Sequence, residues 1–379
     1  MESLAVNDNP EGRSWTLTER LDELGYYTLA GHSDSPRDLI EDARRAEALG
    51  LGSTFLSERF STKDAAVICG GLGAVTERLG IATGVTNHNT RHPLVTATMA
   101  TTMHRMTGGR FALGLGRGFD AVFRGMGLAP ITFAQMEDFT GLMRRLWRGE
   151  RIVDHDGPAG KFPLIQQDPH FDEKIPIIYA ALGPKSMEFA GRCMDGVILH
   201  TFFSEVAVRR AVAAVRRGAD QAGRDPARVR IWSVLAVVPD DIPEELRLRK
   251  LVGRLASYLR GYGDILLQAN GWDPELLARF RADEFVRSFK GSIDGHATPD
   301  QLRHVAKLIP EDWLAASAVG DPAQCAEAVA REFDYGVTGV IMHGATPEEL
   351  ALVTAAYREI RPARWRAAEV AVSNPGWAI

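Results

Sequence analysis

The sequence predicts an α/β fold in which a (β/α)8 barrel, the TIM-barrel architecture, carries a helical insertion between strands seven and eight. Short apolar runs alternate with longer amphipathic segments along most of the 379 residues, and eight such pairs can be counted. Each connection contains a helix, which favours parallel pairing of the strands. An open, doubly wound sheet has the same pattern, but eight regular units favour closure into a barrel.

Four units lie in the first half of the chain, and several of their helices have clear start or stop signals. Ser35-Pro36 is a typical helix start, with a hydroxyl N-cap before a proline, and Gly50 ends that helix. Gly108-Gly109 ends the third helix. The strands predicted here are Gly25–Leu29, Gly52–Leu56, Leu79–Thr83 and Arg110–Leu115, and the helices are Asp38–Leu49, Asp64–Val75, His92–Met106 and Phe133–Trp147.

The second half resumes the alternation after Val153–Lys174, a polar segment rich in Gly, Pro and Asp that we predict to be a loop. The later strands are predicted at Ile175–Ala181, Gly196–His200, Val229–Val238 and Gly339–His343, with helices at Lys185–Cys193, Glu205–Ala222 and Pro347–Ile360. Residues 239–320 have a mostly helical pattern without a convincing strand, so we interpret them as an insertion that caps the barrel mouth. A single barrel domain is expected over residues 20–360, and residues 361–379 are expected to form a C-terminal tail along the surface.

Composition excludes several classes of protein. The formal net charge is −5, without the basic excess expected of a nucleic-acid-binding chain. Three cysteines lie far apart, which indicates neither a disulfide framework nor a zinc cluster, and no metal site is expected. The polar N-terminus lacks the apolar core of a signal peptide, and no apolar run is long enough to span a membrane. We therefore expect a soluble, cytoplasmic protein with a small-molecule substrate.

In a barrel of this type the active site lies at the carboxyl ends of the strands. Gly114, Gly116 and Gly118 alternate along the sequence GLGRG at the end of strand four, where they permit close approach of a flat ligand or a phosphate, although tight turn geometry explains them equally well. Gly183-Pro184-Lys185 opens a helix, and its free N–H groups and nearby cation predict an anion site. No nucleophile motif is present, so chemistry borrowed from an organic cofactor is favoured.

Three stretches carry a family resemblance: DLIEDARRAEALGLGSTFLSER, the segment from Leu79 to Gly118, and IPIIYAALGPKSMEFAGRCMDGVIL. They resemble the luciferase-like monooxygenase superfamily, and the layout is most similar to the branch that uses the deazaflavin coenzyme F420. The resemblance implies that the cofactor ring lies at the strand ends, beside a non-proline cis peptide bond at Gly84-Val85, and that its phosphate lies after strand five. The cofactor-binding residues that follow are Ser57, Arg59, Gly84, Val85, Asn87, Thr90, Gly116, Arg117, Gly118, Ala181, Gly183, Pro184 and Lys185.

Two positions depart from the sugar-phosphate dehydrogenases of that branch. Arg59 stands where they carry a histidine and Phe119 where they carry a glutamate, so the pair that would oxidise a sugar hydroxyl is absent. The catalytic candidates are His32, as a proton donor, and Glu58, as an acid or base near the ring. Each has a structural alternative, a turn histidine for His32 and an ion pair with Arg59 for Glu58.

Three functions remain open at this stage. The leading one is an F420-dependent oxidoreductase that transfers a hydride between the deazaflavin and a small organic substrate. The second is an FMN-dependent luciferase-like monooxygenase that uses O2 and reduced flavin. The third is a barrel that binds a cofactor without catalysis. The resemblance further implies a homodimer.

Overall fold

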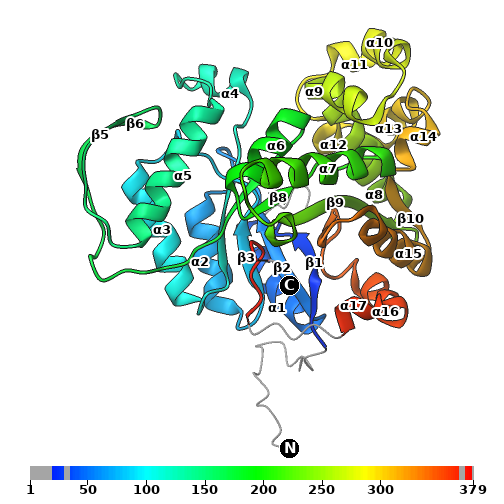
Figure 1. Ribbon diagram of the computed structural model, residues 1–379. Coiled ribbons are helices and arrows are strands. Elements are labelled where there is room, and N and C mark those ends of the chain that lie inside the picture. The colour runs from blue at the N-terminus through cyan, green and yellow to red at the C-terminus, as the bar shows by residue number, and fades with distance from the viewer. Residues whose placement is uncertain (1–18, 30–34, 367–371, 378–379) are drawn as a thin grey trace, which may run out of the picture.

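The computed structural model describes residues 19–29, 35–366 and 372–377. Eight parallel strands close into a barrel in the order β1-β2-β3-β4-β7-β8-β9-β11, and β11 pairs with β1 to complete it (Figure 1). The strands are β1 (Leu21–Tyr27), β2 (Leu51–Leu56), β3 (Gly80–Thr83), β4 (Phe111–Leu115), β7 (Ile177–Ala180), β8 (Gly196–Ile198), β9 (Arg230–Pro239) and β11 (Gly339–His343). The predicted (β/α)8 architecture is therefore confirmed.

Helices connect successive strands and surround the barrel, as the amphipathic segments predicted. They are α1 (Leu39–Ala48), α2 (Ala65–Val75), α3 (Pro93–Met106), α5 (Phe133–Trp147), α6 (Pro184–Cys193), α7 (Glu205–Gln221), α15 (Pro322–Glu332) and α16 (Ala351–Ile360). Ser35 caps a short 3-10 turn, η1 (Pro36–Asp38), that leads into α1, and Asp64 caps α2. No described helix is long and apolar enough to cross a membrane. A further short helix, α4 (Asp120–Gly125), follows β4 and was not predicted.

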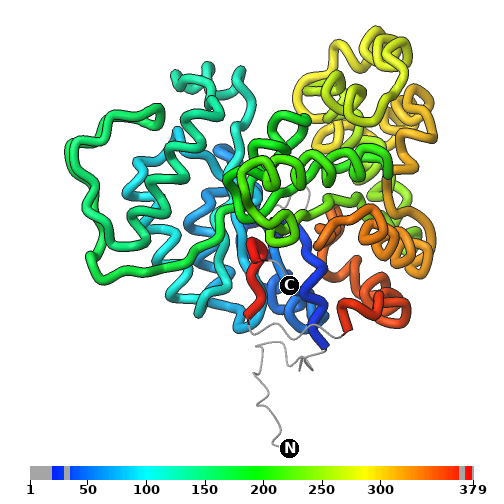
Figure 2. The backbone as a smooth tube through the Cα atoms, viewed as in Figure 1, coloured from blue at the N-terminus to red at the C-terminus, as the bar shows by residue number. Residues whose placement is uncertain are grey.

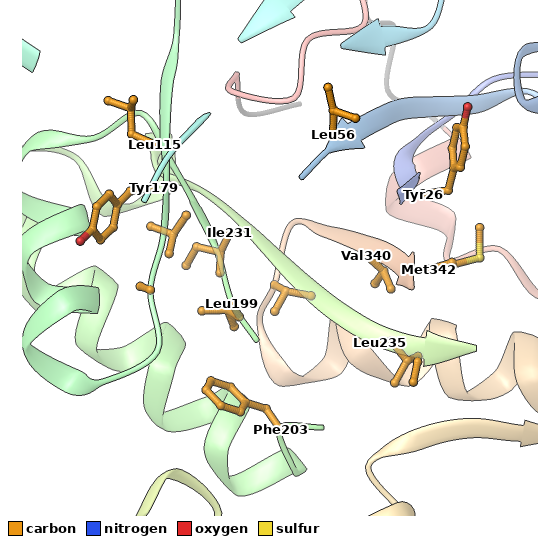
Figure 3. Packing of buried hydrophobic residues seen from close by; sticks show 14 of the residues in the cluster. Tyr26, Leu56, Leu115, Tyr179, Leu199, Phe203, Ile231, Leu235, Val340 and Met342 are labelled. Carbon is orange, nitrogen blue, oxygen red and sulfur yellow. The ribbon is translucent and has the colours of Figure 1, made fainter. Parts of the chain in front are cut away.

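Alternating side chains on the strands build two layers of core. One set points outward and packs under the surrounding helices; it includes Tyr26, Leu56, Leu115, Val340 and Met342 (Figure 3). Their neighbours along the strands point into the barrel, where they form a second cluster of Phe55, Ala82, Ala112, Ile178, Ile198, Trp232, Val234 and Ile341. Both faces of a barrel strand are buried, which explains why these strands read as continuous apolar runs.

Residues 244–314 are helical and lie together to one side of the molecule (Figure 1). They form α8 (Glu244–Leu248), the π-helical turn η3 (Arg249–Gly253), α9 (Arg254–Asn270), α10 (Pro274–Ala282), α11 (Glu284–Ser288), α12 (Ile293–His296), α13 (Pro299–Ala306) and α14 (Glu311–Leu314). The prediction of no strand before residue 320 is wrong at its end, because β10 (Ser317–Gly320) pairs in parallel with β9 at the edge of the barrel. Four residues are too few for a clear strand pattern.

The predicted loop at Val153–Lys174 is also wrong in part. Its first half is an antiparallel hairpin of β5 (Ile152–Gly157) and β6 (Gly160–Ile165), which projects away from the barrel (Figure 2). Most of its side chains are exposed or half-buried, so the apolar alternation that would reveal a strand is weak. The turn residues Gly157 to Gly160 were the sequence feature that could have indicated a hairpin.

The C-terminal segment is not a surface strap where it is described. After α17 (Ala363–Arg366), residues 373–376 are buried at the amino-terminal end of the barrel. Asn374 donates from Nδ2 to the carbonyls of Gly109 and Phe111 at 2.7 and 2.9 Å. The indole of Trp232, inside the barrel, donates to the carbonyl of Pro375 at 2.7 Å. The tail therefore closes the barrel end opposite the one that carries the site described below.

Candidate active site

A cavity of about 1000 Å³ opens at the carboxyl ends of the strands, and each strand of the barrel, or the loop that directly follows it, contributes to its lining. Helix α9 of the insertion adds Tyr258, Tyr262, Ile265 and Gln268. The barrel thus supplies the floor and walls, and the insertion supplies a roof. This is the position predicted for an active site in this fold.

Most of the residues expected at the site line this cavity. They are Ser57, Glu58, Arg59, Gly84, Val85, Asn87, Gly116, Arg117, Gly118, Gly183, Pro184 and Lys185. Thr90 does not line the cavity, and its backbone N–H donates to Oδ1 of Asn87 at 3.0 Å. Ala181 is fully buried and donates its N–H to the carbonyl of Ile198, while Ala180 lines the cavity in its place. His32 lies outside the described residues.

The floor of the cavity is built around the Gly84-Val85 peptide bond, which is cis as expected. Gly84 donates its N–H to the carbonyl of Leu56 at 2.6 Å, and Ser57 donates its hydroxyl to the carbonyl of Gly84 at 2.9 Å. A side chain at Gly116 would place its Cβ only 2.5 Å from Cγ2 of Val85. Glycine at that position therefore leaves the face of Val85 open to a flat ligand.

Positive charge gathers at the amino end of α6. The backbone of this turn is bonded to itself, since Gly183 donates its N–H to Oγ of Ser186 and Ser186 donates its N–H to the carbonyl of Gly183, both at 3.0 Å. Gly183 is the N-cap of α6, and a Cβ added there would meet no atom within 4 Å, so the space in front of the turn is open. Lys185 is exposed to the cavity beside it. Arg117 is held by a 2.6 Å hydrogen bond from Nε to the carbonyl of Ile131, and its guanidinium lies 4.9 Å from the ring centre of Phe133. The set fits a phosphate.

Glu58 is engaged by a partner other than the one predicted. Its carboxylate accepts from Nη2 of Arg91 at 2.5 Å and from the hydroxyl of Thr86 at 2.6 Å, and only 4% of the side chain is exposed. The ion pair raises the pKa of Arg91. Glu58 therefore forms an ion pair, as the structural alternative predicted, but its partner is Arg91 and not Arg59. The carboxylate of Glu58 thereby links the end of β2 to the loop after β3, which carries Thr86 and Arg91.

The roof brings aromatic side chains over the cavity that strand-end reasoning missed. Tyr262 lies parallel to Phe119, with ring centres 5.3 Å apart. Its hydroxyl lies 2.9 Å from Nε2 of His200, and Nδ1 of His200 lies 2.8 Å from the carbonyl of Thr201. The carbonyl only accepts, so Nδ1 carries the proton and Nε2 accepts from Tyr262. The spacing of Tyr258, Tyr262 and Ile265 on one helix face was the signal for this contact.

Burial keeps this pair neutral. It lowers the pKa of His200 to about 4 and, together with Tyr258, raises the pKa of Tyr262 well above its ordinary value. His343, at the end of β11, lies against Tyr27 at 5.2 Å between ring centres. Burial and the nearby charge of Arg254 lower its pKa well below the ordinary value. The site therefore offers neutral hydrogen-bond donors and acceptors to whatever lies beneath the roof.

Comparison with known proteins gives consistent matches over nearly the whole chain. Residues 13–370 match the family model described as luciferase-like monooxygenase. The 5,10-methylenetetrahydromethanopterin reductase of Methanolobus tindarius is 28% identical over 317 residues, covering 82% of this chain and 90% of the relative. The F420-dependent glucose-6-phosphate dehydrogenase of Microbacterium testaceum is 27% identical over 335 residues, with 84% and 90% covered.

Among solved structures, the coenzyme F420 dependent tetrahydromethanopterin reductase of Methanopyrus kandleri has the same fold. It superposes with a TM-score of 0.75 at 20% identity, and the match covers 91% of this chain and 100% of that structure. Because the match covers the whole of that structure, it supports the barrel fold along nearly all of this chain.

Proposed function

The chain belongs to the luciferase-like monooxygenase family, and from this membership we propose that it is a coenzyme F420-dependent oxidoreductase. The observation that carries the proposal is the cavity itself, in which an open glycine floor and a cationic turn meet at the strand ends. The relatives named above support the choice of the deazaflavin, since F420 stands in the name of the dehydrogenase and in that of the solved reductase.

The residues present fit such a cofactor in two places. Gly84, Val85 and Gly116 form a surface for a flat ring, and Lys185 and Arg117 provide charge for a phosphate in the open space before Gly183. The deazaflavin, when bound, exchanges a hydride with an organic substrate. Because Arg59 and Phe119 replace the residues that oxidise a sugar hydroxyl in related dehydrogenases, we favour an activated alkene, imine or carbonyl as the substrate.

A proton accompanies each hydride, and the roof supplies the group that we propose to move it. Tyr262 is a neutral phenol facing the cavity, and its hydroxyl is already oriented by Nε2 of His200. The phenol has a single proton, which it donates to Nε2 of His200 when no substrate is bound. To protonate a substrate oxygen or nitrogen, the O–H turns from the imidazole to that atom, and the phenolate left behind regains its proton from solvent water. Glu58, which is closed off by Arg91, is proposed to position the loop after β3.

We further propose the wider setting of this activity. Residues 20–360 act as one domain, in which the insertion at 239–320 selects the substrate, because α9 forms the roof of the cavity. We place the protein in the cytoplasm as a homodimer. The dimer is supported by the family resemblance and by exposed apolar side chains on two neighbouring helices, Val67 on α2 and Val95 on α3. Sedimentation of the purified protein tests the dimer.

Parallel titration of the purified full-length chain with F420 and with FMN, followed by cofactor fluorescence, tests the cofactor. We expect F420 to bind at least tenfold more tightly than FMN, and reduced F420 to be oxidised by members of a panel of alkenes, imines and carbonyl compounds. Tighter binding of FMN, with oxygen consumption on reduction, would identify a monooxygenase instead. F420 binding without turnover on any member of the panel would favour the non-catalytic barrel.

A further inference from the structure

Arg59, directly after β2, has a cavity-facing guanidinium without a carboxylate partner. It lines the cavity, and its guanidinium has no hydrogen bond or ion pair to any other residue in the described parts of the chain. Its backbone is fixed, because Arg59 and Lys63 exchange N–H and carbonyl bonds at 3.0 and 2.8 Å. The neighbouring carboxylate of Glu58 is taken by Arg91 at 2.5 Å. The planar fork of a guanidinium in this state can take a carboxylate or a phosphate.

The surroundings of Arg59 carry an excess of positive charge. Arg254, at the start of α9, forms an ion pair with Asp294 at 2.9 Å, and both side chains are buried. Ser257 donates to the same carboxylate at 2.7 Å, so Asp294 is already satisfied. Lys63 donates to the carbonyl of Leu29 at 3.2 Å. In the described part of the chain, Asp294 thus acts on both Arg59 and Arg254, and the charge of Lys63 lies near both arginines.

The electrostatic effect of this excess is visible in the individual groups. Burial and the charge of Arg254 lower the pKa of Arg59. Burial, Arg59 and Arg254 together lower the pKa of Lys63 to about 8. Arg59 and Lys63 are thus held in places where burial and neighbouring cations disfavour their charge, and an anion bound beside Arg59 would favour the charge of both.

This corner is separate from the phosphate site. Arg59 follows β2 and Lys185 follows β7, and β3 and β4 lie between those strands. Three strand spacings amount to about 14 Å along the barrel wall. The roof over Arg59 is aromatic, since Tyr258 and Tyr262 both act on its charge. An anion here would lie beside the rings of α9 and near the proton donor proposed above.

We propose that Arg59, supported by Arg254, binds an oxyanion of the substrate, a carboxylate or a phosphate, so that the enzyme acts on a small organic anion. The assignment of this anion to the substrate rests on the proposed function. The planar fork of the guanidinium matches two oxygens of either group. Arg59 would fix one end of the substrate, while its unsaturated bond lies over the floor formed by Gly84 and Gly116. The histidine that related dehydrogenases carry at this position is replaced because an anchor is needed there.

Three probes test the site in the cofactor-free protein: benzoate, phenyl phosphate and the neutral benzamide, each titrated by saturation-transfer NMR. We expect benzoate or phenyl phosphate to bind in the millimolar range and to weaken at least tenfold in Arg59→Gln, while benzamide changes less than twofold. Arg59→Lys should recover part of the loss, because it restores charge without the fork. Thermal melting verifies that each variant is folded, and Arg117→Gln is the matched control at the phosphate site.

Several results would overturn the proposal: neither anion binding to the wild type, unchanged binding in Arg59→Gln, or an equal loss in Arg117→Gln. A fluorescence titration of F420 with the same variants separates the two sources of the anion. Loss of F420 affinity in Arg59→Gln comparable to the loss of benzoate would assign Arg59 to the cofactor and overturn the substrate assignment. Failure of the wild type to bind F420 at all would instead remove the proposed function and leave the anion site standing.

Discussion

The phenol oxygen of Tyr262 lies 2.9 Å from Nε2 of His200, and this hydrogen bond joins the helical insertion to the end of β8. The carbonyl of Thr201 fixes the tautomer of the imidazole, so the direction of the bond is determined. Tyr262 also interrupts α9, with φ −153° and ψ 35° at its own backbone. The insertion therefore contributes a chemical group to the site as well as covering it.

Tyr262→Phe should lower turnover strongly while leaving F420 affinity within about twofold. General acid groups typically contribute about 10²- to 10⁴-fold in rate, and the variant removes the hydroxyl while keeping the ring that stacks on Phe119. Single-turnover oxidation of reduced F420 by the best substrate of the panel measures the effect. Tyr258→Phe, on the same face of α9, is the comparison and should lose far less. Equal losses in both variants would indicate a general effect on the roof.

Glu58→Gln should destabilise the fold by about 3 kcal/mol, since it leaves Arg91 without its buried partner. Asp64→Asn removes the other carboxylate on Arg91, which is 53% exposed, and should cost less than about 1 kcal/mol. Urea unfolding of both variants measures the difference. A stable Glu58→Gln protein with lost turnover would instead support the acid or base role.

Gly183→Asp should weaken F420 binding by about tenfold or more, equivalent to about 1.4 kcal/mol, because it brings negative charge to the phosphate site. The fold should survive, since a side chain at this position meets no atom within 4 Å and aspartate is a favourable N-cap. Gly183→Asn has the same shape without the charge and should retain most of the affinity. Similar losses of F420 affinity in the two variants would mean that the cofactor is displaced by the volume of the added side chain and not by its charge.

Stability should fall with rising pH because of Glu332, a buried residue whose carboxylate accepts from Ser233. Burial raises its pKa from 4.5 to about 7, so between those values the folded protein holds a proton that the unfolded chain releases. The protonated carboxyl of Glu332 therefore contributes a free energy of unfolding of up to about 3 kcal/mol, which is fully present below pH 4.5 and is lost as pH rises through 7. Glu332→Gln should therefore gain stability relative to the wild type between pH 5 and 8. Glu327→Gln, exposed on the same helix, should track the wild type.

Local patterns predict the parts of this protein that depend on local rules. Strand ends were identifiable because burial on both faces gives continuous apolar runs. Gly84-Val85 and Gly183-Pro184-Lys185 come shortly after two such ends in the sequence, so their place in the barrel could be predicted. The partner of Glu58 was not identifiable, because Arg91 lies 33 residues away and its approach depends on how the loop after β3 folds back. The aromatic roof likewise depends on where α9 docks, which its own sequence does not specify.

The closure of the barrel by its own C-terminus is the clearest case of such long-range packing. Asn374 meets carbonyls more than 260 residues earlier in the chain, and Arg230 donates to the carbonyls of Asn374 and Asp22 at 2.6 and 2.7 Å. Burial lowers the pKa of Arg230 to about 9, so its charge depends on these carbonyls. The sequence analysis placed this tail along the surface, because partners so far away in the chain leave no local pattern.

Asn374→Ala should destabilise the protein by about 2–3 kcal/mol. The variant deprives the buried carbonyls of Gly109 and Phe111 of their donor, and each group left unsatisfied costs about 1–3 kcal/mol. Val372→Ala, at a side chain that is 42% exposed in the same segment, should change stability by less than about 0.5 kcal/mol. Urea denaturation followed by tryptophan fluorescence measures both, because Trp232 contacts the tail through Pro375. F420 affinity should be unaffected in folded Asn374→Ala, since the tail lies at the opposite end of the barrel. A neutral effect on stability would mean that the tail does not hold the barrel end closed.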